Sequence, residues 1–204
     1  MGGLQLTDTV KHLLIINIVV FFLVQGYLRI PLAVYYPGYA AFKPFQVVTH
    51  MFAHANTSHL FFNMFSLFIF GPMVEHRLGT KHFFKLYFIA GFGALALHLA
   101  TKYIELNFLG APPELMQIPM LGASGALMGV VAAFATLFPN MRVQLLIPPI
   151  PMKAKHMALL FIGLDLWLGM GRYNTGVAHF AHVGGAIIGY LYVTFFSKGN
   201  YRIN

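Results

Sequence analysis

Long apolar runs, separated by short polar or Pro- and Gly-containing segments, repeat along the chain. The clearest run covers residues 121–138 and contains no charged side chain. As a helix with a 1.5 Å rise per residue it would extend about 27 Å, close to the hydrocarbon thickness of a bilayer. Five other runs have a similar character. The pattern predicts six transmembrane helices, over residues 13–29, 59–75, 83–100, 121–138, 156–170 and 177–196.

The composition strengthens this interpretation. The 204 residues are 58% hydrophobic and only 9% charged, and the mean hydropathy is +0.72, whereas soluble domains carry about 25% charged residues. We therefore expect an all-α, polytopic integral membrane protein with a single domain over residues 1–204. The absence of cysteine excludes disulfides, thiolate metal sites and a cysteine nucleophile. The first apolar run is too long for a cleaved signal peptide and lacks an Ala-x-Ala-like exit.

The positive charges predict the orientation rather than a nucleic-acid partner. The formal net charge is +8, but the 13 basic residues are scattered near the ends of the apolar runs. With the N-terminus inside, nine lie on the inner side and four on the outer side, and the outer ones are Arg29, Lys43, Lys102 and Arg172. The positive-inside rule then places both termini in the cytoplasm. With no targeting segment apparent, we expect a prokaryotic inner membrane.

Three distant stretches place polar residues at similar depth. His59 and Asn63 are four residues apart and share one helical face. Ser124 begins the fourth apolar run and His182 begins the sixth. In the predicted orientation all three helices enter from the outer side, so these side chains fall near the outer leaflet. Polar groups there are costly unless they have partners or line a wet cavity. A common cavity that opens outward would explain them together.

Small residues predict which helices touch. Gly125 and Gly129 form one GxxxG pair, and Gly185 and Gly189 form another. Such pairs let helix backbones approach closely. Spacings of three and then four put His182 on the same face as the second pair, so a contact would carry this histidine toward the serine helix. Plain helix packing explains the glycines equally well.

The combined motif resembles the rhomboid family of intramembrane serine proteases. It consists of His59 with Asn63, Gly-Ala-Ser-Gly at residues 122–125 and Ala-His-x-x-Gly-x-x-x-Gly at residues 181–189. The histidines upstream of Asn63 and the turn at residues 75–79 extend the likeness over the whole predicted six-helix core. Each part alone is a weak signal, whereas the combination is specific.

The resemblance implies a rhomboid-like six-helix bundle with serine endopeptidase activity. Ser124 would be the nucleophile, and His182 would be the general base and later the general acid. The Ser124 N–H with the side chains of His59 and Asn63 would form the oxyanion hole. The partners would be the lipid bilayer and the transmembrane segments of substrate proteins. Neither a metal nor an organic cofactor is implied, and the oligomeric state is not indicated.

Two positions depart from the pattern of some family members. Met128 stands where they carry an aromatic residue, four positions after the serine, and His179 stands where they carry asparagine. Asp165 is a possible third member of a triad. It is the weaker alternative because the family works with a dyad, and because this carboxylate can equally meet water or Arg172.

Other classes of protein explain the motif less well. A metalloenzyme could use His50 and His54, four residues apart, with His59, His179 and His182. However, no His-Glu-x-x-His motif is present, and the chain holds only five acidic residues. A non-catalytic rhomboid-like protein that binds membrane clients is the alternative within the family, although such proteins usually lose the serine or the histidine. A transporter is not favoured, since no inverted repeat is visible.

Overall fold

The computed structural model describes residues 5–24, 30–145, 149–171 and 177–196. Within these ranges the chain is mostly helical, and a long helix lies at each of the six predicted segments. The α-helices are α1 (Asp8–Leu23), α2 (Gln46–Thr49), α3 (Thr57–Leu78), α4 (Thr80–Phe108), α5 (Ser124–Leu137), α6 (Ala154–Met170) and α7 (His179–Phe196). The shorter elements are the 3-10 helices η2 (His50–Phe52) and η3 (Pro113–Gln117) and the strands β1 (Arg142–Gln144) and β2 (Pro151–Lys153).

Several element bounds differ from the sequence-based ones. α4 continues to Phe108, where a loop was expected from residue 101, because this stretch contains no Gly or Pro to stop it. β1 and β2 pair as a short antiparallel hairpin in the connection between the fourth and fifth predicted helices. The cap of α3 is Asn56, whose side chain accepts from the N–H of His59 at 2.8 Å. Residues 25–29 and Arg172 lie outside the described part of the chain.

The number of membrane crossings is only partly supported. α3 and α4 are long and apolar enough to cross a bilayer on their own, whereas α5 is apolar but has only 14 residues. Among the described residues, two of the six predicted spans are therefore both long enough and apolar enough to cross a bilayer. The six-span count stays a prediction.

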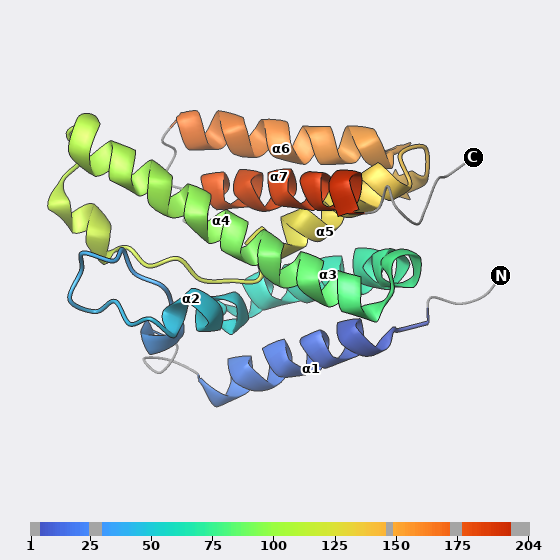
Figure 1. The fold of residues 1–204 in the computed structure, drawn as a ribbon, viewed down its shortest axis with the longest axis horizontal. Coiled ribbons are helices and arrows are strands. Elements are labelled where there is room, and N and C mark those ends of the chain that lie inside the picture. The colour runs from blue at the N-terminus through green and yellow to red at the C-terminus, as the bar shows by residue number, and fades with distance from the viewer. Residues whose placement is uncertain (1–4, 25–29, 146–148, 172–176, 197–204) are drawn as a thin grey trace.

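α5 is the central helix of the bundle. Eleven of its 14 residues are buried, and it packs against α3, α4 and α7. α4 crosses the face of the bundle that is nearest the viewer in Figure 1. The first turn of α1 and the last turn of α7 lie at the same end of the bundle (Figure 1). This end holds both described chain ends; the side of the membrane that it faces stays a prediction.

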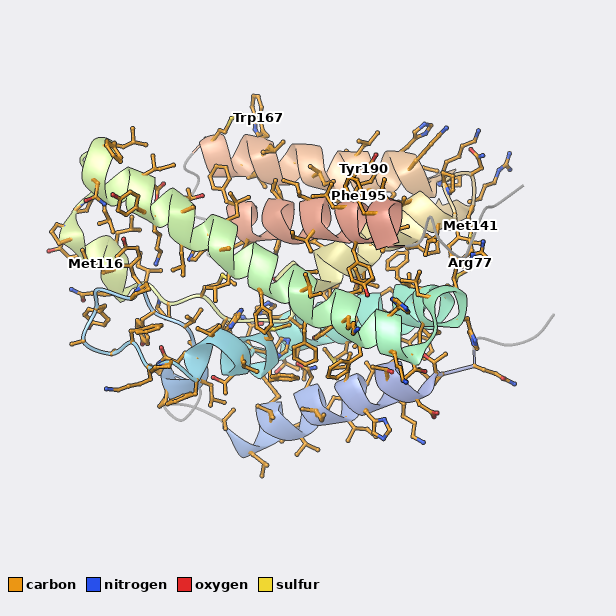
Figure 2. The ribbon with its side chains drawn as sticks, viewed as in Figure 1. Arg77, Met116, Met141, Trp167, Tyr190 and Phe195 are labelled. Carbon is orange, nitrogen blue, oxygen red and sulfur yellow. The ribbon has the colours of Figure 1, made fainter. Side chains whose placement is uncertain are left out.

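Large apolar side chains cover the outside of the bundle. Leu23, Leu159, Trp167 and Phe195 are each at least 66% exposed. Figure 2 shows Trp167 on α6 pointing away from the other helices. Soluble proteins rarely expose contiguous apolar surface on this scale. The surface is suited to lipid, as the composition predicted.

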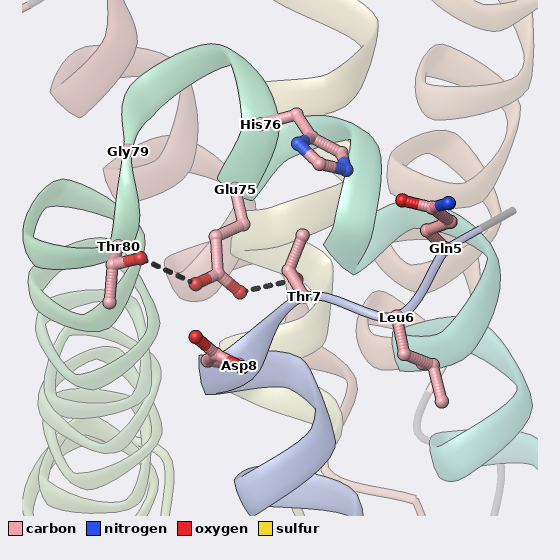
Figure 3. Close-up of a pocket in the computed structure, with 8 residues that line it drawn as sticks. All are labelled: Gln5, Leu6, Thr7, Asp8, Glu75, His76, Gly79 and Thr80. Carbon is pink, nitrogen blue, oxygen red and sulfur yellow. Dashed lines mark hydrogen bonds between the residues drawn. The ribbon is translucent and has the colours of Figure 1, made fainter.

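Glu75 lies near the end of α3, at the opposite end of that helix from His59. Its hydrogen bonds connect the start of α1 to the junction between α3 and α4. Its carboxylate accepts from the hydroxyls of Thr7 at 2.5 Å and Thr80 at 3.0 Å (Figure 3), and from the hydroxyl of Thr9 at 2.7 Å. It also accepts from the backbone N–H groups of Thr9 at 3.2 Å and Val10 at 3.1 Å. A carboxylate is the preferred partner for the unpaired N–H groups of a helix start. These bonds explain why α1 begins at Asp8, before residue 13, where the first helix was predicted to begin.

Candidate active site

Backbone contact between α5 and α7 builds the core of the site. A Cβ added at Gly185 would lie 1.9 Å from the carbonyl oxygen of Gly125. One added at Gly189 would lie 2.0 Å from the carbonyl oxygen of Gly129. No other residue type fits at these two positions without moving the helices. The contact predicted from the two GxxxG pairs is therefore present.

This contact brings Ser124 and His182 together across 58 positions of sequence. The Nε2 atom of His182 lies 2.8 Å from the Oγ atom of Ser124, within hydrogen-bond range. Both residues are partly buried, and the His182 side chain is 16% exposed. Ser124 is the first residue of α5, so its N–H is one of the helix-start groups that have no partner within the helix.

Gly122 sets the distance between Ser124 and His59. It has φ +118°, a conformation that L side chains rarely adopt, and a Cβ there would lie 2.7 Å from the Cε1 and Nε2 atoms of His59. The N–H of Ala55 donates to Nδ1 of His59 at 3.4 Å. Since Nδ1 accepts, the neutral ring carries its proton on Nε2. His59 thus presents an N–H donor to the loop just before Ser124.

Asn63 lies one turn further along α3 and is buried, with 5% exposure. Its Nδ2 atom donates to the carbonyl oxygen of His59 at 2.9 Å. A primary amide has two N–H donors, so one bond to the helix leaves the second for another acceptor. Whether Asn63 and His59 serve as oxyanion donors stays a prediction.

His50 and His54 lie behind His59 and are both 1% exposed. The Nδ1 atom of His50 donates to the carbonyl oxygen of Gln46 at 2.9 Å, and the ring of His54 meets that of His59 edge-on at 5.1 Å. Burial lowers the pKa of each of the two buried histidines from 6.5 to about 4. They are therefore neutral at neutral pH. The carbonyl oxygen of His50 also accepts from the N–H of Gly122 at 2.8 Å, which ties this segment to the active-site loop.

Asp165 of α6 meets both histidines at the start of α7. Its Oδ1 atom lies 2.7 Å from Nδ1 of His179 and 3.1 Å from Nδ1 of His182, and Oδ2 lies 3.2 Å from the latter. From the sequence, a triad that includes Asp165 was the weaker alternative. The ligand atoms of these three residues lie within 4.8 Å of one another, and within the described ranges no other group of three or more could hold a metal. His50 and His54, which the disfavoured metalloenzyme alternative would have used, are not members of this group. Direct hydrogen bonds account for the geometry.

A cavity of about 890 Å³ opens beside the site. His59, His98, Lys102, Glu105 and His179 are among its lining residues. Such a volume is large enough for water and for a short peptide segment. The sequence pattern predicted an outward-opening cavity at the starts of the second, fourth and sixth helices, and this cavity reaches the starts of α3 and α7.

Lys102 is a lining residue that the sequence pattern did not single out. It was counted as an outer-side loop cation, but it lies in α4 and is 4% exposed. Its Nζ atom donates to the carbonyl oxygen of Leu115 at 3.1 Å and to that of Ile118. These bonds hold the η3 segment against α4 at the rim of the cavity. The sequence signal that could have identified Lys102 is its position one turn after His98, at the end of an apolar helical stretch.

The fold and the site together define a helical membrane protein that holds a serine hydroxyl within hydrogen-bond distance of an imidazole, an arrangement that nucleophilic catalysis requires. A comparison with protein families shows where the chain belongs. Residues 41–199 match the family model described as Rhomboid domain. The chain belongs to the rhomboid family.

Characterised relatives come from mitochondria and from bacteria. Rhomboid protein 1, mitochondrial, of Saccharomyces cerevisiae is 33% identical over 156 residues, which cover 74% of this chain and 42% of that protein. Rhomboid protease AarA of Providencia stuartii is 31% identical over 150 residues, covering 69% and 52%. Presenilin-associated rhomboid-like protein, mitochondrial, of Homo sapiens is 30% identical over 148 residues, covering 71% and 36%. This chain matches about half or less of each relative.

These relatives bear on the expected location. An integral membrane protein is what the family implies. The expectation of a prokaryotic inner membrane is weakened, because mitochondrial proteins are prominent among the relatives. The charge bias that suggested the orientation does not depend on which membrane holds the protein.

Proposed function

We propose that the protein is an intramembrane serine endopeptidase that hydrolyses peptide bonds in or near transmembrane segments of other membrane proteins. The observation that carries this proposal is the 2.8 Å separation between Ser124 Oγ and His182 Nε2. A hydroxyl needs an adjacent base to act as a nucleophile at neutral pH. The similarity to rhomboid protease AarA of Providencia stuartii supports the same activity.

In the first half of the reaction, Ser124 Oγ attacks the carbonyl carbon of the scissile bond while His182 Nε2 takes the hydroxyl proton. The tetrahedral intermediate then collapses, the C–N bond breaks, and His182 gives its proton to the leaving amine. In the second half, water attacks the acyl carbon with His182 again as the base, the C–O bond to Ser124 breaks, and His182 returns the proton to Ser124 Oγ. The cavity of about 890 Å³ that His59 and His179 line supports this step, because it has room for water.

The negative charge of the intermediate would be held by three donors. These are the N–H of Ser124 at the start of α5, the Nε2–H of His59 and the free N–H of the Asn63 amide. Loss of one such donor typically costs about 2.7–4 kcal/mol in the activation barrier. The approach of His59 to Gly122, two residues before the nucleophile, supports its part in this group.

The membrane arrangement follows from the same helices. We propose that the chain crosses the bilayer six times, as one domain, with both termini on the side that holds nine of its basic residues. α5 has 14 residues and so extends about 21 Å, against a hydrocarbon core of about 30 Å. If its C-terminal end reaches one surface, Ser124 is recessed several ångströms below the other. A substrate helix would unwind locally to reach it, since a helical carbonyl is already hydrogen-bonded.

The test is cleavage of a model transmembrane substrate in detergent by the wild type, Ser124→Ala and His182→Ala. Matched controls are Ser58→Ala and His156→Ala, which change an exposed serine and an exposed histidine. We expect both site variants to lose at least about 1,000-fold in kcat/KM and both controls to keep wild-type activity. Equal cleavage by the wild type and the two site variants would refute the dyad.

Two other outcomes identify the alternatives. If the wild type binds the model transmembrane substrate but does not cleave it, the protein is a client-binding member of the family rather than a protease. If cleavage is lost on chelation but survives in Ser124→Ala, the chemistry is metal-dependent. A fluorophosphonate probe gives a second readout, because it should label Ser124 only while His182 is intact.

A further inference from the structure

Asp165 sits where two histidines converge, next to the reacting pair. It lies in α6, is 8% exposed, and hydrogen-bonds to His179 and His182 from α7. A buried carboxylate is expensive unless several donors satisfy it. Here two imidazole N–H groups do so. The chain has only five acidic residues, and this one lies within an otherwise apolar stretch of α6, residues 157–170.

Local packing holds α6 against the start of α7 at this point. Gly169 follows Asp165 by four residues and therefore lies on the same face of α6. A Cβ at Gly169 would lie 3.0 Å from the ring of Phe180 and 3.3 Å from Cβ of His179. The missing side chain lets the two helices approach, and the three-residue spacing of His179 and His182 turns both rings toward the carboxylate.

The hydrogen-bond direction fixes the state of His182. An aspartate carboxylate can only accept, so the Nδ1 atoms of both histidines carry protons. In neutral His182 this leaves Nε2 unprotonated. Nε2 is the atom 2.8 Å from Ser124 Oγ, and it must be unprotonated to take the serine proton. The opposite tautomer would place a proton between the two atoms and block the transfer.

The same bond stabilises the charge that develops during the reaction. When His182 accepts the serine proton, its ring becomes positive with the Asp165 carboxylate 3.1 Å away. The two side chains are only 16% and 12% exposed, so water screens the attraction weakly. His179 holds the carboxylate from the other side at 2.7 Å, which keeps it aimed at His182.

We propose that Asp165 is a positioning residue that completes a Ser124–His182–Asp165 triad, with His179 fixing the carboxylate. This inference rests on the proposed protease function and adds to it a residue that the family resemblance, with its dyad, does not supply. The competing explanation is a structural bridge that merely joins α6 to α7. The two differ in what happens to the imidazole of His182 when the carboxylate is removed.

The experiment compares Asp165→Asn, Asp165→Glu and His179→Asn with the wild type, and uses Asp8→Asn as the matched control at an exposed acidic residue. Four quantities are measured in one detergent: kcat for the model substrate, KM for the same substrate, the rate of fluorophosphonate labelling of Ser124, and the thermal unfolding temperature. The fifth is the NMR signal of the His182 Nδ1 proton in protein with ¹⁵N-labelled histidine, assigned through its loss in His182→Ala.

For Asp165→Asn we expect kcat and the labelling rate to fall by roughly 100-fold to 10,000-fold, with KM changed by less than about threefold. An asparagine amide can donate to Nδ1 and thereby select the wrong tautomer, so the Nδ1 proton signal should disappear. Asp165→Glu should recover part of the rate and the signal. His179→Asn should have a smaller effect, of roughly tenfold, since the carboxylate remains.

Several results would overturn the proposal. A wild-type kcat in Asp165→Asn would do so, as would a loss of rate that follows only a lowered unfolding temperature and is not recovered by glutamate. The failure of the proposed function looks different: the wild type itself would neither cleave nor label. In that case the Nδ1 proton signal would still report the hydrogen bond, but the bond would have no catalytic role.

Discussion

The contact between α5 and α7 can be widened by a single methyl group at Gly189, about two turns along α7 from His182. A Cβ at Gly189 would lie 2.0 Å from the carbonyl oxygen of Gly129, and real Cβ atoms essentially never approach a neighbour within 3.0 Å. Gly189→Ala must therefore separate the helices by about 1 Å. Carried to the site, this shift lengthens the 2.8 Å distance from His182 Nε2 to Ser124 Oγ to about 3.8 Å, beyond hydrogen-bond range.

Displacement of a reacting group by about 1 Å typically costs about 100-fold in rate. Overpacking of a tight contact also costs about 1–3 kcal/mol of stability. We therefore expect Gly189→Ala to lose about 100-fold in kcat/KM and to unfold at a lower temperature. Cleavage of the model substrate and the rate of fluorophosphonate labelling measure the first effect. Thermal unfolding in the same detergent measures the second.

Gly163→Ala is the matched control. Gly163 lies within α6, and a Cβ there has no atom within 4 Å. The same chemical change should leave the activity unaltered and raise the stability by up to about 1 kcal/mol, because alanine favours helix. Wild-type activity and stability in Gly189→Ala would refute the backbone contact. An equal loss in Gly163→Ala would show that added methyl groups disturb the bundle in general.

The remaining predictions concern groups outside the reacting pair. Glu75→Gln should lower the free energy of unfolding by about 2–4 kcal/mol, since a buried carboxylate that accepts from Thr7, Thr9 and Thr80 is lost; an unchanged unfolding temperature would contradict this. His50, with its pKa lowered from 6.5 to about 4, stays neutral in the fold while the unfolded chain takes up a proton. Stability should therefore fall as the pH drops from 6.5 to about 4, by up to about 3 kcal/mol from this group, and be unaffected by it above 6.5. Thermal unfolding over this pH range should be less acid-sensitive in His50→Gln than in the wild type or in the control His156→Gln.

The positions of the long helices and the meeting of Ser124 with His182 could be predicted from the sequence. Apolar runs long enough to form membrane helices are visible without any tertiary information. The glycine pairs at 125 and 129 and at 185 and 189 identified the faces that touch. Because His182 shares a face with the second pair, its approach to the serine helix followed from helical geometry alone.

Other features depend on contacts that no local pattern reveals. Asp165 precedes His182 by 17 positions on a different helix, and only the angle between α6 and α7 decides whether they meet. The start of α1 depends on Glu75, which is more than 60 positions away. Lys102 was read as a loop cation because basic residues usually end a membrane helix. Its two carbonyl partners lie in the segment at 113–118, whose return to α4 is a tertiary effect.

The glycine contact between α5 and α7 limits which helices of the bundle can move apart. Where two backbones meet without side chains between them, neither helix can slide or tilt on rotatable groups. Parting them would leave polar carbonyls facing lipid with nothing to fill the gap. This contact is therefore rigid. In the proposed protease, a substrate helix would enter between other helices of the bundle, while Ser124 and His182 stay within hydrogen-bond distance.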